Sequence, residues 1–113
     1  MAVTPKSLAL NDQIAGTSDA AVDTLYTANN GIAQIDALTV INSDSSARDI
    51  SIYILADDIA ATTVSPVFKS IPANGQLIIS DLIGHKIPQG GTLAAFASVT
   101  NVLRVIASGV EFT

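Results

Sequence analysis

The clearest pattern of apolar and polar positions is RDISIYIL, residues 48–55. Ile50, Ile52 and Ile54 fall on one side of an extended backbone, because successive side chains of a strand point to opposite faces. Ser51 falls on the other side. The pattern predicts a β-strand whose isoleucine face is turned toward a hydrophobic core.

A second alternation runs along residues 100–112, TNVLRVIASGVEF. Both faces of this segment are mostly apolar, which is typical of a strand that is covered on both sides. Arg104 is the exception. It either extends its charged end into water at a rim or forms an ion pair with another subunit, and the rim is favoured because surface charges seldom need a partner.

Turn-forming residues recur at short intervals between the strand-like segments, and no linker divides the chain. Residues 19–26, DAAVDTLY, fit either a short helix or a strand that enters the turn NNG, Asn29–Gly31. Many short strands at this spacing predict an all-β protein with a single antiparallel β-sandwich.

Two Asn-Gly turns, each followed by a strand that carries an aspartate, form a faint internal echo at residues 28–38 and 73–82. Asn-Gly pairs tolerate the positive φ angles of tight hairpins. We therefore interpret both as hairpin turns rather than as a duplicated unit. In the second, Pro72 fixes φ, the Asn-Gly pair reverses the chain, and residues 76–80 return as the partner strand.

Residues 1–23 differ from residues 24–113, which we assign to the β-sandwich domain. The first eleven residues carry Pro5, little alternation and no turn that ties them to the following strands. We therefore predict an extended N-terminal arm or edge segment, of the kind that is ordered only when something docks it.

Four residues are candidate contacts with a neighbouring subunit: Val3, Leu8, Leu10 and Arg104. The three aliphatic ones lie in the N-terminal segment, which could add backbone hydrogen bonds to an exposed sheet edge of a neighbour.

The composition favours an oligomer or a docked subunit. Hydrophobic residues make up 49% of the 113 residues and charged residues only 13%, compared with a typical value of about 25% for charged residues. A lone domain with so few charges would expose much aliphatic surface, and large exposed apolar patches usually mark contact sites. The alternative is a compact β-domain with a surface rich in Ala, Ser and Thr.

The net charge of −5 and the five scattered Lys and Arg residues argue against nucleic acid as a partner, because no basic surface is available to neutralise phosphates. Anionic membranes are unsuitable for the same reason. No signal peptide is recognisable at the N-terminus. Residues 92–110 imitate a membrane span, but Arg104 and the polar break SVTN fit two strands and a turn better.

The sequence offers no catalytic, cofactor-binding or metal-binding residues, and we predict a protein that is not an enzyme. His85 is the only histidine and lies in a turn-rich segment, and cysteine is absent. A solvated loop residue is the favoured interpretation of His85. Residues 42–49, NSDSSARD, are rich in oxygen ligands but lack the spacing of a calcium loop, so calcium at a subunit boundary stays a minor alternative.

The turns and strands together resemble those of small bacteriophage virion proteins. The resemblance is carried by LYTANNGIAQIDALTVINSDSSARDISIYIL (25–55), KSIPANGQLIISDL (69–82) and HKIPQGGTLAAFAS (85–98), with a closing SGVE. It implies a jelly-roll-like β-sandwich that assembles as a homotrimer on the capsid exterior or tail, against the major capsid protein or a tail protein.

Within that group, the leading expectation is a capsid decoration (cement) protein that stabilises the head through contacts between subunits. The alternative is a tail or fibre module that binds a host surface or another tail protein. A carbohydrate-binding β-sandwich ranks lower, because the chain lacks tryptophan for stacking on sugars.

Overall fold

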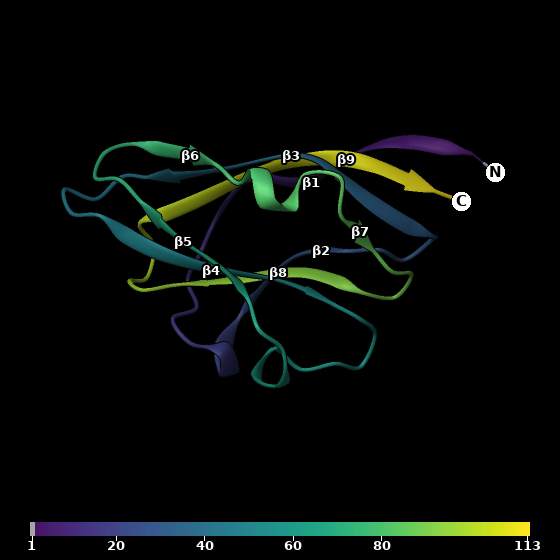
Figure 1. Cartoon of the computed structure of the whole chain (residues 1–113), viewed down its shortest axis with the longest axis horizontal. Helices are drawn as coiled ribbons and strands as arrows, with labels where there is room; N and C mark the ends of the chain where they lie inside the picture. Colours follow the sequence, from purple (N-terminus) through teal and green to yellow (C-terminus); the bar gives the residue numbers. More distant parts are fainter. Residues whose placement is uncertain (1) are drawn as a thin grey trace.

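The computed structural model describes residues 2–113 and consists of two antiparallel β-sheets packed face to face (Figure 1). Sheet A contains, in spatial order, β1 (Val3–Gln13), β9 (Leu103–Phe112), β3 (Ile32–Asn42) and β6 (Gln76–Ile78), with β7 (Lys86–Ile87) also paired to β3. Sheet B contains β2 (Asp23–Thr27), β8 (Thr92–Ala97), β4 (Arg48–Leu55) and β5 (Val67–Ile71). Three single-turn 3-10 helices lie in the connections: η1 (Asp19–Ala21), η2 (Ala61–Thr63) and η3 (Ser80–Leu82). The prediction of an all-β sandwich is confirmed.

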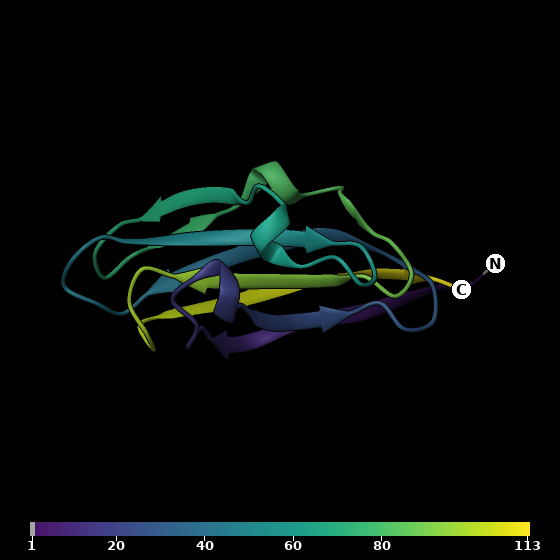
Figure 2. The ribbon, with the colours of Figure 1, turned by 90° about the horizontal axis from the view of Figure 1, so that it is seen from below.

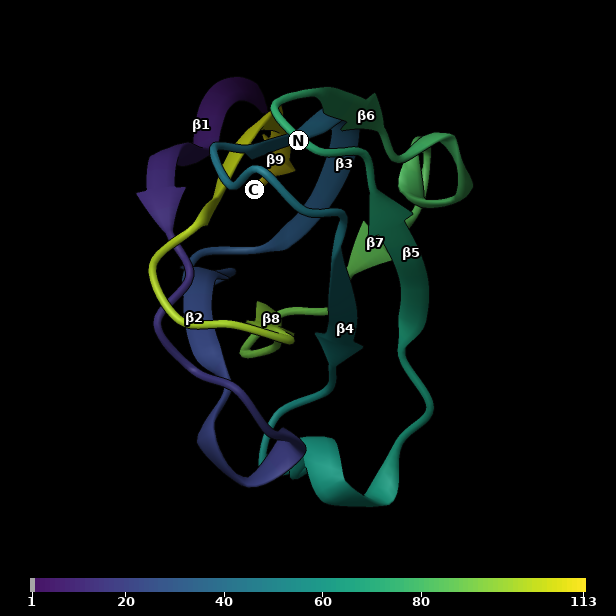
Figure 3. The ribbon, with the colours of Figure 1, turned by 90° about the vertical axis from the view of Figure 1, so that its left-hand side faces the viewer.

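The strand pairs are nested along the chain. β4 pairs with β5, β3 with β6 and β7, β2 with β8, and β1 with β9. The chain is therefore arranged like one long antiparallel hairpin that is folded so that successive pairs alternate between the sheets. Figure 3 looks along the sandwich, with β1, β9, β3 and β6 in the upper layer and β2, β8 and β4 in the lower one.

Neither Asn-Gly segment forms the hairpin that we expected. Asn29–Gly31 connects β2 in sheet B to β3 in sheet A, and Pro72–Gly75 connects β5 in sheet B to β6 in sheet A. The second is a tight turn, with a φ of 50° at Asn74 and a hydrogen bond of 3.2 Å from the Gly75 N–H to the Pro72 carbonyl oxygen. An Asn-Gly pair marks a reversal of the chain, but the apolar pattern of the following strand decides which sheet that strand joins.

The buried side chain of Asn42 joins two connections at one end of the sandwich. Its Nδ2 lies 3.0 Å from the carbonyl oxygen of Ser46 and 3.2 Å from those of Ile71 and Pro72. Its Oδ1 accepts the Asp44 N–H at 2.9 Å. A buried amide is tolerated when its polar atoms are paired in this way, and the side chain holds the β3–β4 connection against the start of the β5–β6 turn.

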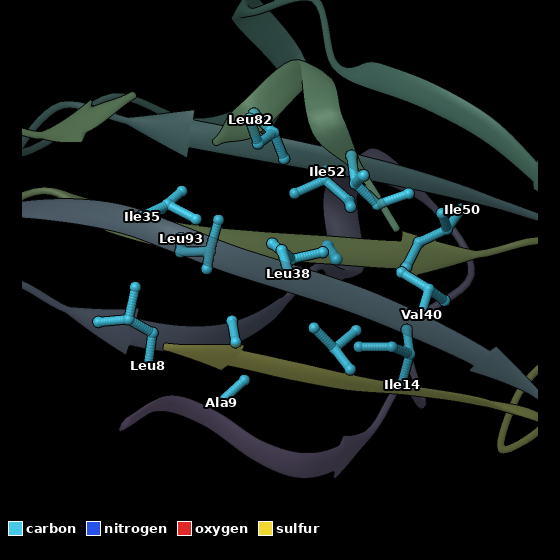
Figure 4. Packing of buried hydrophobic residues seen from close by; sticks show 14 of the residues in the cluster. Leu8, Ala9, Ile14, Ile35, Leu38, Val40, Ile50, Ile52, Leu82 and Leu93 are labelled. Atoms are coloured by element: carbon cyan, nitrogen blue, oxygen red, sulfur yellow. The ribbon is translucent and has the colours of Figure 1, made fainter. Parts of the chain in front are cut away.

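The core lies between the sheets and is almost entirely aliphatic (Figure 4). Ile50 and Ile52 of β4 belong to the same buried cluster as Leu38 and Val40 of β3. Burial of a side chain of this size stabilises the fold by about 1.5–3 kcal/mol. The strand predicted at residues 48–55 and its inward isoleucine face are confirmed.

A second, smaller cluster covers the outer side of sheet B. Tyr53 of β4 and Ala94 of β8 are buried there together with Ala61 of η2, and Val22 and Val64 pack against them. Figure 2 shows the segments that carry η1 and η2 in front of the sheets. The η1 and η2 segments therefore cover the β4 and β8 part of this side, whereas Phe68 of β5 stays 60% exposed.

β9 has the predicted alternation, but within residues 2–113 only one of its faces is covered. Val105 and Ala107 are buried in the core, whereas Arg104, Ile106 and Ser108 are exposed. The expected cover on both sides is absent from the part of the chain that the structure describes.

The predicted N-terminal arm is not confirmed, because residues 3–13 form β1 and pair with β9. Leu8 and Ile14 belong to the main core cluster, so residue 23 does not mark the end of a free arm. β1 is an edge strand. Pro5 and two irregularities in its register with β9 make its outer edge a poor template for a further strand.

Residues 92–110, which imitate a membrane span, form β8, the following connection and most of β9. The two strands and the turn predicted there are confirmed, with Asn101 in the connection at a φ of 62°. Across residues 2–113, no helix has the length and apolar character needed to cross a bilayer.

Candidate functional site

An apolar row crosses the outer side of sheet A, which we call the open face. Strand register places Leu10 of β1 opposite Ile106 of β9. Ile106 in turn lies opposite Thr39 of β3, and Thr39 lies opposite Ile78 of β6. Directly opposed residues of antiparallel strands share a face, and Leu10, Ile106 and Ile78 are 79%, 43% and 63% exposed. We call these four residues the central row.

Residues of different size flank the central row on its two sides. On one side, Ser108 lies opposite Ser7 and Ala37, which are all small and exposed. On the other side, Arg104 lies opposite Ile41, both of them long side chains. The open face is therefore lower on one side of the central row and higher on the other.

Beyond the small residues, the open face is apolar again near the chain ends. Val3, Phe112 and Ile32 lie opposite one another at this end of β1, β9 and β3. Val3 is 58% exposed and Ile32 is 44% exposed. Several exposed apolar side chains are thus spread along the length of sheet A.

Few charged side chains interrupt this face. Arg104 lies on the high side of the central row, and its Nη1 donates to the Asn11 carbonyl oxygen at 3.1 Å. Asp36 lies on the low side in a bulge of β3, where its Oδ1 accepts from Gln34 Nε2 at 3.2 Å. Lys86 of β7 lies further out, opposite Gln34. The open face therefore carries one positive and one negative group next to its central row.

Three of the four interface residues predicted from the sequence lie on this face: Val3, Leu10 and Arg104. The prediction for Leu8 is wrong, because its side chain is 1% exposed and belongs to the core. The register of β1 shifts between Ser7 and Ala9, which turns Leu8 inward.

Sequence reasoning missed the contribution of Ile78, Asp36 and Ile32 to this face. The alternation of residues 100–112 already placed Ile106 beside Arg104, but nothing in the sequence showed which strands would lie next to them. Only the register of β1, β9, β3 and β6 brings these side chains together.

The groups considered for chemistry are dispersed. His85 is exposed in the connection between η3 and β7. Asp44 forms an ion pair of 2.6 Å with Arg48, whose hydrogen bond holds the pKa of that carboxyl below its usual range. Among residues 2–113, no group of three or more His, Cys, Asp or Glu side chains could hold a metal ion.

An open groove of about 510 Å³ lies between β1 and β2 and is lined by Asp12, Gln13 and residues 22–25. Asp23 Oδ2 accepts the Ala15 N–H at 2.5 Å, so this carboxylate holds the β1–β2 connection in place. One of the two carboxylates that line the groove therefore has a structural role.

One buried carboxylate links the two sheets. Glu111 of β9 is 2% exposed, and its Oε2 accepts the Tyr26 O–H from β2. Its Oε1 has no hydrogen-bond partner among the described residues. Burial, followed by the hydrogen bond to Glu111 and its charge, raises the pKa of Tyr26 to about 12.

Comparisons of the chain with known protein families, with curated proteins and with solved structures gave no match.

Proposed function

We propose that this chain is a structural protein of a bacteriophage particle, a capsid decoration protein that stabilises the head through contacts between subunits. The open face carries this proposal. Its exposed aliphatic row lies on paired strands, and an apolar surface of this kind is normally covered by another protein surface.

The nested strand pairing supports a jelly roll as the architecture. A jelly roll is an eight-stranded antiparallel sandwich made of two Greek keys, and it recurs in viral capsid domains. Here β6 and β7 together occupy the position of one strand, since both pair with β3. The remaining pairs follow the same outward order from β4 and β5 to β1 and β9.

The distribution of polar groups supports a role without catalysis, on the outside of the particle. Asp44 and Asp23 hold connections in place, and Glu111 bridges the sheets. The net charge of −5 would repel packed DNA, which favours a position away from the genome.

Quantitative mass spectrometry of purified particles that encode this chain tests the proposal. We expect many copies per particle, and we expect particles without the chain to lose resistance to heat. A few copies per particle would favour a tail or fibre module instead. Particles that never contain the chain would overturn the proposal.

A matched pair of variants connects the open face to this role. Ile106→Asp places a charge in the central row, whereas Phe68→Asp places one at a more exposed apolar residue of β5 in sheet B. We expect the first variant to fail to protect particles and the second to protect them. Equal protection by both would separate the role in the particle from the open face.

A further inference from the structure

We propose that the open face is the interface between two copies of this chain, related by a two-fold axis that runs along the central row. This inference rests on the part of the proposed function that assigns the open face to contacts between subunits. The placement of charges and the sizes of the side chains select a second copy as the occupant, and the dimensions of the molecule allow a contact of standard size.

The axis follows from the direction of the central row, which crosses the strands of sheet A. When a second copy is turned over about this row, each of its strands keeps its place across the sheet but runs in the opposite direction. Leu10, Ile106 and Ile78 then meet the same three residues of the other copy. An interface of this isologous type uses one patch on both subunits.

The two charged groups beside the central row become partners under the same rotation. Arg104 is two residues from Ile106 along β9, or about 7 Å at ~3.3 Å per residue. Asp36 lies on the other side, in the β3 bulge between the partners of Ser108 and Gly109, roughly 7–10 Å from the row. Turning over the second copy therefore places its Arg104 above β9 of the first copy, one strand away from Asp36 on β3 of the first copy. The same pair forms on the other side of the central row with the two copies exchanged.

The sizes of the flanking residues fit the same arrangement. The rotation lays the high side of one copy, with Arg104 and Ile41, over the low side of the other, with Ser108 and Ala37. Each long side chain therefore faces a small one. A contact between two high sides would hold the central rows apart.

The area of the face is adequate for a stable pair. Both sheets extend along the longest and shortest axes of the molecule, which measure 45 Å and 19 Å (Figure 2). Their product of about 850 Å² bounds the projected area of one whole side of the molecule, so a contact of standard size, in which each partner buries ~800 Å², would cover nearly all of the outer side of sheet A. The family resemblance implies a trimer, whereas this self-complementary layout favours a dimer.

Analytical ultracentrifugation of the full chain tests the arrangement through a charge exchange. Arg104→Glu and Asp36→Arg should each weaken the dimer at least about tenfold, because each sets like charges against each other in a close pair. The double variant restores the opposite charges and should recover the dimer to within roughly threefold of the original.

The recovery is specific to a second copy, because Arg104 and Asp36 lie on opposite sides of the central row of one chain and form no ion pair with each other among residues 2–113. Thermal unfolding checks that the variants fold, since both positions are exposed. A dimer without recovery in the double variant overturns the proposed pairing. A trimer overturns the two-fold axis but leaves the proposed function in place. A monomer overturns the pairing of two copies, and the particle experiment with Ile106→Asp then decides the proposed function.

Discussion

The outer sides of the two sheets carry similar apolar residues but are covered differently. On sheet B, Tyr53 and Ala94 are buried under residues of the η1 and η2 segments. On sheet A, Leu10, Ile106 and Ile78 remain exposed. Both sheets thus present apolar side chains away from the common core. Among residues 2–113, the chain covers those on β4 and β8 of sheet B, whereas Phe68 at the edge of sheet B and the apolar residues of sheet A stay exposed.

The lengths of the connections explain this difference. The two longest, residues 14–22 and 56–66, carry η1 and η2, whose segments cover sheet B (Figure 2). The connections at residues 28–31 and 72–75 only cross from one sheet to the other. Apolar residues on the outer side of a sheet can therefore be covered by a loop of the same chain or by a second molecule. Among residues 2–113, no such loop covers the apolar row of sheet A.

The largest expected effect comes from removing a covered residue of sheet B. Tyr53→Ala should lower the free energy of unfolding by about 3–5 kcal/mol, in the range for aromatic residues in a packed cluster. Ile106→Thr on the open face keeps a β-branched side chain and should change the stability of the monomer by less than about 0.5 kcal/mol. Urea unfolding of both variants at a concentration where the chain is monomeric makes the measurement. Similar losses for the two would show that the two outer sides are equally buried.

The same comparison shows what could be predicted from the sequence. Alternation at residues 48–55 and 100–112 predicted the two central strands, because a half-buried strand repeats every two residues. The inward face was predicted correctly for residues 48–55, whereas residues 100–112 were expected to be covered on both sides and are covered on one. Asn29–Gly31 and Pro72–Gly75 were correctly located as turns but were wrong as hairpins. A turn depends on local backbone angles, whereas the identity of the paired strand depends on residues far away in the chain.

The candidate site was predicted in part for the same reason. Val3 and Leu10 were chosen as aliphatic residues of an N-terminal segment expected to contact a neighbour, and Arg104 as the one charge in a mostly apolar strand; the structure places all three on the open face. The prediction for Leu8 was wrong because a bulge in β1 turns its side chain into the core, and no local sequence motif indicates that bulge. Asp36 was missed because only the pairing of β3 with β9 places it and Arg104 on the two sides of the central row.

The next effect concerns Asn42, whose side chain holds the β3–β4 connection against the end of β5 and the start of the β5–β6 turn. Asn42→Ala removes the donors for carbonyl oxygens of Ser46, Ile71 and Pro72. Leaving these buried or partly buried carbonyl groups without a partner should cost about 1–3 kcal/mol. Ser43→Ala, which removes an exposed hydrogen bond to Val102, is the matched control and should cost little. Differential scanning calorimetry of both variants compares them, and equal melting temperatures would contradict the role of Asn42.

A smaller effect should appear only in the association of the chain. Leu10→Asp adds a charge to the central row and should weaken self-association at least about tenfold, which corresponds to ~1.4 kcal/mol. Phe68→Asp changes an apolar side chain of 60% exposure on sheet B and should leave association unchanged. Sedimentation equilibrium of the two variants over the same concentrations gives both constants. If Phe68→Asp weakens association more, the outer side of sheet B is the contact surface.

The smallest effect on stability at neutral pH concerns the ionisation of the two tyrosines, which occupy different environments. Tyr26 lies between the sheets with its O–H bonded to Glu111, and Tyr53 lies under the loops of sheet B. Burial, with a smaller contribution from the charge of Asp19, also raises the pKa of Tyr53 above its ordinary value. With only two tyrosines in the chain, Tyr53→Phe leaves Tyr26 as the sole source of tyrosinate absorbance, and Tyr26→Phe leaves Tyr53.

Tyr26 should make the fold sensitive to alkaline pH. Its pKa is raised from 10.0 to about 12 in the folded chain, so the folded state favours the neutral phenol. The stability that this preference contributes is fully present below pH 10 and is lost as the pH rises through 12. We therefore expect the melting temperature of the Tyr53→Phe chain to fall between these values. In Tyr26→Phe, the part of the fall that Tyr26 causes should be missing.

The tyrosinate absorbance of Tyr53→Phe should rise only toward pH 12, at every protein concentration, because the Tyr26–Glu111 bond lies inside one chain. Ionisation of Tyr26 near pH 10 would contradict its buried hydrogen bond. A dependence on concentration would place Tyr26 in a contact between chains rather than between the two sheets of one.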